Sequence, residues 1–319
     1  MSRQTKRFID DGFAVWIDGD DRSTVYLNSW ITRSGVSYID IAIRIYGTKD
    51  VKTVNFYVPF AIKENELIDL YKSLNDTSVL CGLFNMNCRI DTNESPYTSE
   101  IKYRDRVLSL ISMEKDITKV EELGNGSIIT IDLTKIHEHI KSDESYIIFR
   151  LPHKSINELF EQKMDATGKL RRFVDLITSP VVTQKYGYSI RINEARVLPE
   201  QINQIEVLHT QRLKKVIISM AINEDFEVND ANCYRIRRLE RVYKNYTPDG
   251  FDNDKTITYQ WLEERDKNMT AHYNFYFSFL HSRMSANSLG IYLILFIMIG
   301  ALGSFIGTVV FEGLKLIFG

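Results

Sequence analysis

The sequence predicts a mainly β (α+β) protein, in which an antiparallel β-sandwich-like cytosolic region with a few helices precedes one C-terminal transmembrane helix. Three observations lead to this fold class. Apolar and polar residues alternate in short runs between Phe13 and Leu262, as in half-buried strands. Glycine, asparagine and aspartate separate many of these runs, as expected for turns. Residues 288–311 then form a run without a charged side chain.

The first sixty residues are expected to form a meander of antiparallel strands, because alternation recurs there between turn signals. In the third strand, one face carries four isoleucines and the other carries Asp40, Ala42 and Arg44. The spacing of apolar residues then changes, which predicts a short amphipathic helix over 64–74. The strands expected in this part are 13–17, 25–31, 38–46 and 51–60.

Similar patterns continue through the rest of the β-rich region. Further strands are expected at 79–90, 106–111, 128–133, 146–151, 181–197, 216–222, 231–246 and 256–262. Helices are expected at 155–164 and 199–213. A polar break at 163–169 suggests a boundary. The predicted parts are an N-terminal β-rich domain (1–165), a second β-rich part (166–265), a juxtamembrane aromatic-rich segment (266–287) and the transmembrane helix (288–311).

The apolar run 288–311 is long enough to span a membrane, because a hydrocarbon core of ~30 Å requires about 20 helical residues. A buried core helix would normally be shorter or carry a polar face. Small residues allow membrane helices to approach closely, which predicts self-association and a homo-oligomer. The residues expected at this oligomer or pore surface are Gly300, Gly303, Ser304, Gly307 and Glu312.

Glu312 allows two interpretations. It lies one turn from Lys315 on a continued helix and could pair with it at the level of the lipid headgroups. A ring of Glu312 side chains from several subunits could instead line one mouth of a pore. The segment 266–287 also leaves two alternatives, an interfacial aromatic anchor or a helix continuous with the span.

The distribution of cysteine and basic residues indicates a cytoplasmic location for the large N-terminal part. Three cysteines suggest no disulfide framework, and the N-terminus shows no secretory signal. Arg265, Lys267 and Arg283 precede the span whereas only Lys315 follows it. These features predict a single-pass membrane protein whose large N-terminal part is cytoplasmic.

Motifs of the common enzyme classes are absent, so a non-enzyme is expected, with no cofactor and no metal. His137 and His139 are two residues apart and would point in different directions on a helix, which favours a solvated helix start over a metal site.

A basic cluster rich in tyrosine is the main candidate for ligand binding. Guanidinium groups hold phosphates through paired hydrogen bonds, and aromatic rings stack on bases. The alternative is a solvated charged face that pairs with Glu240. The predicted ligand-binding residues are Tyr234, Arg235, Arg237, Arg238, Arg241 and Tyr243. Secondary candidates are Lys169, Arg171, Arg172, Arg212, Lys214 and Lys215.

The layout, with a β-rich part at 13–262 and a glycine-faced C-terminal span, resembles the membrane effectors of bacterial anti-phage nucleotide-signalling systems, and most of all the Hailong transmembrane effector. The resemblance implies an oligomeric ion channel gated by a nucleotide or short DNA oligomer, which a partner nucleotidyltransferase makes. It implies that the ligand is a short deoxyadenosine oligomer that restrains the pore, and that the protein lies in the bacterial inner membrane. No residue role follows from it, because no family motif maps onto this chain.

The sequence therefore leaves two alternative functions. The first is a membrane-anchored effector of an anti-phage defence system, an oligomeric ion channel gated by a nucleotide ligand bound to the β-rich region. The alternative is a tail-anchored scaffold or adaptor that binds protein partners at the membrane and forms no pore.

Overall fold

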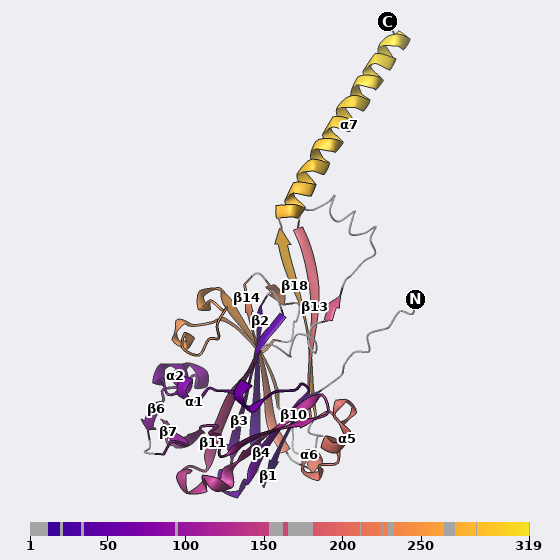
Figure 1. Cartoon of the computed structure of the whole chain (residues 1–319). Coiled ribbons are helices and arrows are strands. Elements are labelled where there is room, and N and C mark those ends of the chain that lie inside the picture. The colour runs from indigo at the N-terminus through magenta and orange to yellow at the C-terminus, as the bar shows by residue number, and fades with distance from the viewer. Residues whose placement is uncertain are drawn as a thin grey trace. The chain divides into compact units, whose positions relative to one another are not determined.

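The computed structural model of the chain is mostly β, with several sheets and one long C-terminal apolar helix (Figure 1). This confirms the predicted fold class. The residues that the structure describes are 12–19, 22–32, 35–92, 95–152, 162–164, 181–210, 212–224, 226–228, 233–264, 272–284 and 286–318.

The chain divides into two compact units, which are described separately. Unit 1 comprises Met1–Glu161, Tyr188–Glu224 and Asp230–Phe277, and unit 2 comprises Gln162–Gly187, Asp225–Asn229 and Ser278–Gly319. Strands from both predicted β-rich parts belong to one sheet of unit 1. The predicted boundary at 165/166 stays a prediction, because residues 165–180 lie outside the described residues.

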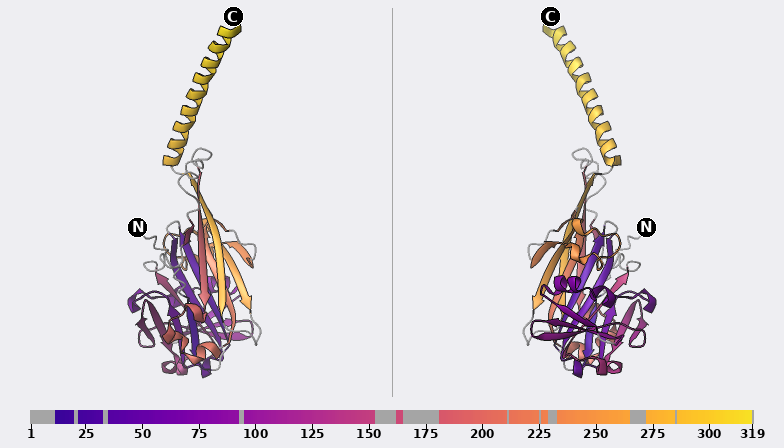
Figure 2. Two further views of the ribbon diagram at one scale, coloured as in Figure 1. Left: turned by 90° about the vertical axis from the view of Figure 1, so that its right-hand side faces the viewer. Right: turned by 90° about the vertical axis from the view of Figure 1, so that its left-hand side faces the viewer.

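The large sheet of unit 1 contains ten strands within the described ranges, and β2, β3 and β14 run side by side in it (Figures 1 and 2). Neighbouring strands are antiparallel except for the parallel pairs β14–β2 and β11–β8. Its order is β16 (Arg235–Arg238), β17 (Thr256–Glu264), β14 (Arg212–Asn223), β2 (Arg22–Thr32), β3 (Gly35–Tyr46), β11 (Glu144–Pro152), β8 (Arg106–Ile111), β7 (Thr98–Tyr103) and β6 (Arg89–Thr92), with β5 (Ile68–Asp69) paired to β11.

A smaller antiparallel sheet contains β1 (Ala14–Asp18), β4 (Thr53–Val58), β10 (Gly126–Asp132) and β9 (Thr118–Leu123), in the order β1-β4-β10-β9. The predicted meander of the first four strands is therefore wrong: β2 and β3 form a hairpin in the large sheet, whereas β1 and β4 pair with each other in the small one.

The apolar face of β3 is buried between the two sheets. All four isoleucines of that face are at most 2% exposed. Phe56 of β4 and Phe149 of β11 meet there with ring centroids 5.1 Å apart. The alternation in β3 thus correctly separates this core face from the face that carries Asp40, Ala42 and Arg44.

Helices cover parts of unit 1 that the sequence patterns assigned differently. The predicted strand 79–90 is wrong, because Thr77–Phe84 is helix α2 and only Arg89–Thr92 is a strand. Asp76 caps α2 by accepting the Ser78 N–H at 2.9 Å, while Val79 and Leu80 are buried. Burial of one helical face outweighs the weak β pattern of this short apolar run.

Other expected segments are broken into shorter pieces. The predicted helix 64–74 contains η2 (Glu64–Glu66), β5 and α1 (Tyr71–Leu74). The predicted helix 199–213 contains α5 (Glu200–Asn203) and α6 (Glu206–Thr210) and ends in β14. The predicted strand 231–246 is reduced to β16 and the 3-10 turn η7 (Arg241–Tyr243). The other 3-10 turns among the described residues are η1 (Thr48–Asp50), η3 (Leu133–Lys135), η4 (His137–His139), η6 (Ala195–Val197) and η8 (Asn253–Lys255).

The third sheet has the order β12-β13-β18-β15 and contributes to unit 2. Its strands are β12 (Gln162–Met164), β13 (Val181–Ile192), β18 (Tyr273–Met284) and β15 (Phe226–Val228). The predicted helix 155–164 is wrong over Gln162–Met164, and the rest of it lies outside the described residues. The juxtamembrane aromatic segment is a strand over Tyr273–Met284, so the alternative of a helix continuous with the span is wrong there.

Unit 2 ends in α7 (Ala286–Phe318). Its segment Leu289–Lys315 is long and apolar enough to cross a membrane, and none of its most apolar stretch is buried within the chain. Its length and apolar composition are those of a membrane-spanning helix.

Candidate ligand cavity

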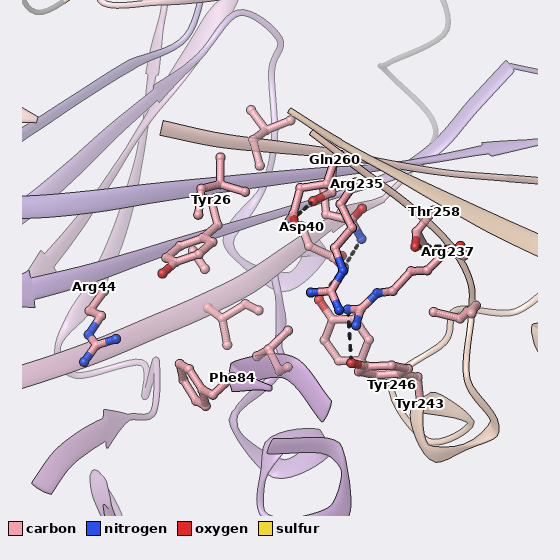
Figure 3. Close-up of a pocket in the computed structure, with 18 of the residues that line it drawn as sticks. Tyr26, Asp40, Arg44, Phe84, Arg235, Arg237, Tyr243, Tyr246, Thr258 and Gln260 are labelled. Carbon is pink, nitrogen blue, oxygen red and sulfur yellow. Dashed lines mark hydrogen bonds between the residues drawn. The ribbon is translucent and has the colours of Figure 1, made fainter. Parts of the chain in front are cut away.

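A cavity of about 280 Å³ lies in unit 1, on the face of the large sheet that carries Asp40, Ala42 and Arg44 (Figure 3). This volume lies close to the lower end of the ~300–1,000 Å³ common for small-molecule sites. The lining residues are Tyr26, Leu27, Asn28, Trp30, Asp40, Ala42, Arg44, Leu83, Phe84, Met86, Tyr146, Ile148, Ile217, Ser219, Arg235, Arg237, Leu239, Tyr243, Tyr246, Thr258 and Gln260.

The floor of the cavity contains a polar row that crosses five strands. Residues paired in register share one face of a sheet. The successive partners from β16 to β3 are Arg235, Gln260, Ser219, Asn28 and Asp40. The Gln260 amide donates to Ser219 Oγ at 3.4 Å, and the Asn28 amide donates to Asp40 Oδ2 at 3.4 Å. One end of the row is therefore cationic, and its middle offers amide and hydroxyl groups.

Arg235 and Arg237 reach the cavity because they alternate with outward-facing residues on β16. Figure 3 shows their side chains extending toward Tyr243 and Tyr246. The Arg237 Nη2 donates to Tyr243 Oη at 3.3 Å, and its Nη1 lies 3.8 Å from the Glu240 carboxylate. Arg235 has no ion pair among the described residues. Of the three arginines that line the cavity, Arg44 and Arg237 have a carboxylate nearby, so Arg235 carries the least compensated positive charge.

The side of the cavity opposite the sheet is formed by α2 and by the segment that contains η7. Leu83, Phe84 and Met86 contribute apolar surface there. Gly82 permits this packing, because a Cβ at that position would lie only 2.7 Å from Tyr243 Oη. Tyr243 is buried, and burial is the main reason that its pKa is raised. It remains a neutral phenol at ordinary pH.

Asp40 forms the centre of a buried network beside the cavity. Its carboxylate accepts hydrogen bonds from Arg150 Nε at 2.5 Å, Trp30 Nε1 at 2.7 Å and Tyr246 Oη at 2.7 Å. Burial alone would lower the pKa of Arg150, but the charge and the hydrogen bonds of Asp40, together with the neighbouring Tyr246 and Tyr38, outweigh burial and raise the pKa. This pair is neutralised internally, so it positions Tyr246 rather than attracting an anion.

A second network lies around Arg44. Its Nη2 donates to Glu144 at 2.5 Å and also to the Tyr103 hydroxyl. Burial alone would raise the pKa of Glu144, but hydrogen bonds from Arg44 and Tyr103, together with the charges of Arg44 and Arg106, outweigh burial and lower the pKa. The pKa of Tyr26 is raised to about 12, mainly by burial and to a smaller extent by the neighbouring Tyr46. Neutral aromatic side chains thus predominate at this end of the cavity, where Tyr26 and Phe84 each meet Tyr146 edge to face.

The arrangement is suited to binding an anion that has an aromatic part. Guanidinium groups can hold phosphate or carboxylate oxygens, and aromatic rings that line a cavity can stack on a planar group. Within the part of the chain that the structure describes, no group of three or more His, Cys, Asp or Glu could hold a metal ion. His137 instead bonds to the Val51 carbonyl at 2.8 Å, and His139 packs on Tyr97.

Three of the six predicted ligand-binding residues line the cavity, namely Arg235, Arg237 and Tyr243. The other three do not. Arg238 pairs with Glu224 at 3.3 Å, Arg241 pairs with Asp254 at 3.1 Å, and Tyr234 is 67% exposed. Arg238 points away from the cavity because side chains alternate between the two faces of β16. Arg241 lies beyond the end of the strand, in η7.

The secondary basic candidates lie elsewhere or are not described. Lys214 Nζ lies 5.6 Å from the centroid of the Tyr46 ring, and Lys215 Nζ lies 4.0 Å from the Glu264 carboxylate. Arg212 begins β14. Lys169, Arg171 and Arg172 lie outside the described residues.

Sequence reasoning missed most of the aromatic and amide lining, including Tyr26, Asn28, Phe84, Tyr146 and Gln260. One signal was available: the face of β3 with Asp40, Ala42 and Arg44 is too polar for a core and too apolar for a solvated surface. The other residues come from strands and a helix whose neighbours cannot be read from local pattern.

The predicted oligomer residues lie on α7. Gly300, Gly303 and Gly307 would each place a new Cβ in open space, and Glu312 is exposed. Thr308 Oγ1 donates to the Ser304 carbonyl at 3.0 Å, as hydroxyl side chains do in membrane helices. This small-residue surface is uncovered within the single chain, and its role in assembly stays a prediction.

Comparisons with known proteins assign no family. No family model and no curated protein matches the chain. Among solved structures, the chain is similar to a "putative protease" from Parabacteroides distasonis, with 7% identity and a TM-score of 0.22. The match covers 84% of this chain and 41% of that one. A score this low carries no argument about function.

Proposed function

We propose that this protein is a membrane-anchored receptor for an anionic aromatic ligand of the nucleotide class, and that its ligand controls an oligomeric ion channel formed by α7. The observation that carries the proposal is the cavity, in which Arg235 and Arg237 share a lining with several tyrosines and Phe84. The helix α7, long and apolar enough to cross a membrane, supports the anchor.

The charge on the cavity supports an anionic ligand. The Asp40 and Glu144 carboxylates are already bound by Arg150 and Arg44. Arg235 retains an uncompensated charge, and Glu240 lies 3.8 Å from Arg237 at best. A phosphate near both guanidinium groups would gain charge-assisted hydrogen bonds, which are stronger than neutral ones.

The aromatic lining supports a planar part of the ligand. Tyr26, Phe84 and Tyr146 form one aromatic cluster of the cavity, and Tyr243 and Tyr246 form another, with ring centroids 6.5 Å apart. Stacking of a base on an aromatic side chain contributes about 1–3 kcal/mol. Side-chain amides at Asn28 and Gln260 add groups that can donate to and accept from a base edge.

Calorimetry on the full-length protein in detergent micelles tests binding. The probes are ATP, cyclic di-AMP and a 5′-phosphorylated deoxyadenosine dinucleotide. Arg235→Glu should abolish or strongly weaken binding of the probe that the wild type binds, and the wild-type affinity should fall as salt rises. Arg238→Glu is the matched control: it lies on the same strand but points away from the cavity and pairs with Glu224.

Aromatic variants separate stacking from charge. Tyr243→Ala should weaken binding with little change in the salt dependence, whereas the exposed Tyr234→Ala should leave it unchanged. Equal losses in Arg235→Glu and Arg238→Glu, or no binding of any of the three probes, would contradict the assignment of this cavity.

The channel part of the proposal requires a separate experiment. Cells that express the protein should show a change in membrane potential that depends on an intact cavity. Replacement of α7 by an unrelated apolar span should remove this effect. A variant that keeps full activity with the unrelated span would instead support the scaffold or adaptor function.

The defence role is tested in a host together with a partner nucleotidyltransferase. In the proposed system, phage plating should fall when both genes are present and recover with Arg235→Glu or with a defective α7. Protection that is independent of both changes would contradict the role of a nucleotide-gated effector.

A further inference from the structure

Two free cysteines, Cys81 and Cys88, lie close together at the two ends of a segment that lines the cavity. The Cys88 backbone N–H donates to Cys81 Sγ at 3.2 Å, and Cys81 Sγ lies 3.7 Å from the Cys88 carbonyl oxygen. Cys81 is half-buried, whereas Cys88 is 9% exposed. The third cysteine, Cys233, lies apart from this pair, near the Arg235 and Gln260 carbonyls.

The termination of α2 brings the two thiols together. Asn85 adopts a left-handed conformation with φ of 51°, and the Met86 N–H donates to the Cys81 carbonyl at 3.1 Å. This is the hydrogen-bond pattern of a Schellman cap, in which the chain reverses after the helix. The reversal returns Cys88 to the side of Cys81, and Cys88 Sγ lies 3.4 Å from the Met86 carbonyl oxygen.

The segment between the thiols belongs to the cavity wall. Leu83, Phe84 and Met86 all line the cavity, and all lie between Cys81 and Cys88 in the sequence. A covalent bond between the two sulfurs would therefore close a short loop that carries these three side chains. Such a loop would hold the helix cap and the wall in one arrangement.

We propose that Cys81 and Cys88 form a reversible disulfide when the protein meets a peroxide, and that this bond stabilises the wall of the cavity. In the first step, the Cys81 thiolate attacks one oxygen of hydrogen peroxide, giving a sulfenic acid and hydroxide. In the second step, the Cys88 thiolate attacks the Cys81 sulfur and expels hydroxide. Overall, two thiols and one peroxide give one disulfide and two waters.

The environments of the sulfurs support this order. Cys81 is the more exposed of the two. The pKa of Cys88 is raised to about 11, mainly by burial and to a smaller extent by the neighbouring Cys81. Because the thiolate is the attacking species, disulfide formation by Cys88 should be slow at neutral pH. Below this pKa, its rate should rise about tenfold for each unit by which the pH is increased.

The experiment uses the full-length protein in detergent micelles with Cys233→Ser, so that only two thiols remain. After treatment with hydrogen peroxide and alkylation, intact mass spectrometry should show the loss of about two hydrogen masses and no alkylation. A disulfide reductant should restore both alkylations. Cys81→Ser and Cys88→Ser should each prevent the mass loss.

A second measurement follows the wall itself. Hydrogen exchange of the Met86 amide, which bonds to the Cys81 carbonyl, should slow several-fold in the oxidised protein and return after reduction. Release of a fluorescent ATP derivative should slow as well. This last effect depends on the proposed function, whereas the mass loss and the hydrogen exchange do not.

The outcomes separate the two proposals. The disulfide proposal would be overturned if both thiols remained alkylatable or if oxidation of Cys81 stopped at sulfinic acid. A closure rate without pH dependence would overturn the attacking role of the Cys88 thiolate. Unchanged exchange at Met86 after disulfide formation would overturn the effect on the wall. Disulfide formation without binding of any nucleotide would count against the proposed ligand class only.

Discussion

Neutralising Asp40 should destabilise unit 1 more than any single change at its surface ion pairs. Asp40 and Arg150 are 2% and 7% exposed, and the carboxylate bonds both Nε and Nη2 of the guanidinium, at 2.5 and 3.0 Å. In Asp40→Asn the side chain keeps its shape, but Arg150 remains buried without a counter-charge. Breaking one partner of a buried pair costs about 3–5 kcal/mol.

The structure favours the lower end of that range. The introduced amide would retain one carbonyl oxygen that can accept from Trp30 or Tyr246, and Arg150 Nη2 would still donate to the Tyr246 carbonyl at 2.9 Å. We therefore expect a loss of about 3 kcal/mol in the free energy of unfolding. This is a large fraction of the ~5–15 kcal/mol typical of a folded domain.

Urea unfolding of the full-length protein in detergent micelles measures this loss. All three tryptophans, Trp16, Trp30 and Trp261, belong to unit 1, so their fluorescence reports on that unit. Asp254→Asn, at the exposed pair with Arg241, is the control and should change nothing measurable. The double variant Asp40→Asn, Arg150→Met should recover much of the loss, because it removes the unpaired charge.

A loss below about 1 kcal/mol in Asp40→Asn would refute this reasoning, since it would equal an ordinary neutral hydrogen bond. Failure of the double variant to exceed the single variant in stability would also refute it. In that case the destabilisation would come from lost contacts and not from the buried charge of Arg150.

Four other changes have definite expected outcomes. Gly82→Val should force Tyr243 aside and cost about 1–3 kcal/mol of stability together with nucleotide affinity, as measured by urea unfolding and calorimetry. Because the pKa of Glu144 is lower in the folded protein, its ionised form stabilises the fold at pH values above the unfolded-state pKa of 4.5. This stabilisation is lost as the pH falls through the folded-state pKa, so Glu144→Gln should make the free energy of unfolding less dependent on pH in the acid range. Gly303→Leu should reduce the oligomer mass in detergent without changing the tryptophan fluorescence of unit 1, and an unchanged mass would assign assembly to another surface. A reporter fused after Gly319 should be active only outside the cytoplasm, and cytoplasmic activity would reject the expected topology.

The sequence by itself determined the features that depend on local periodicity. Alternation over 38–46 separated the buried isoleucines of β3 from the face with Asp40 and Arg44, because side chains of a strand point to opposite sides. The same alternation predicted that Arg235, Arg237 and Arg241 share one face of a strand. This is right for Arg235 and Arg237 on β16 and wrong for Arg241, which lies beyond the end of the strand in η7. The uncharged run at 288–311 identified α7 through length and composition alone.

Only the tertiary structure decided which distant segments meet. β14 lies beside β2, and β16 reaches the same sheet through β17, so Arg235 and Asn28 share one floor although local pattern contains no information on strand partners. Arg238 and Arg241 belong to the same basic run as Arg235, yet carboxylates at Glu224 and Asp254 bind them outside the cavity. The apolar run at 77–84 forms a helix because Asp76 caps it and the sheet buries Val79 and Leu80. Burial and long-range strand pairing are properties of the folded chain, and they bring the charged and aromatic residues together around one cavity.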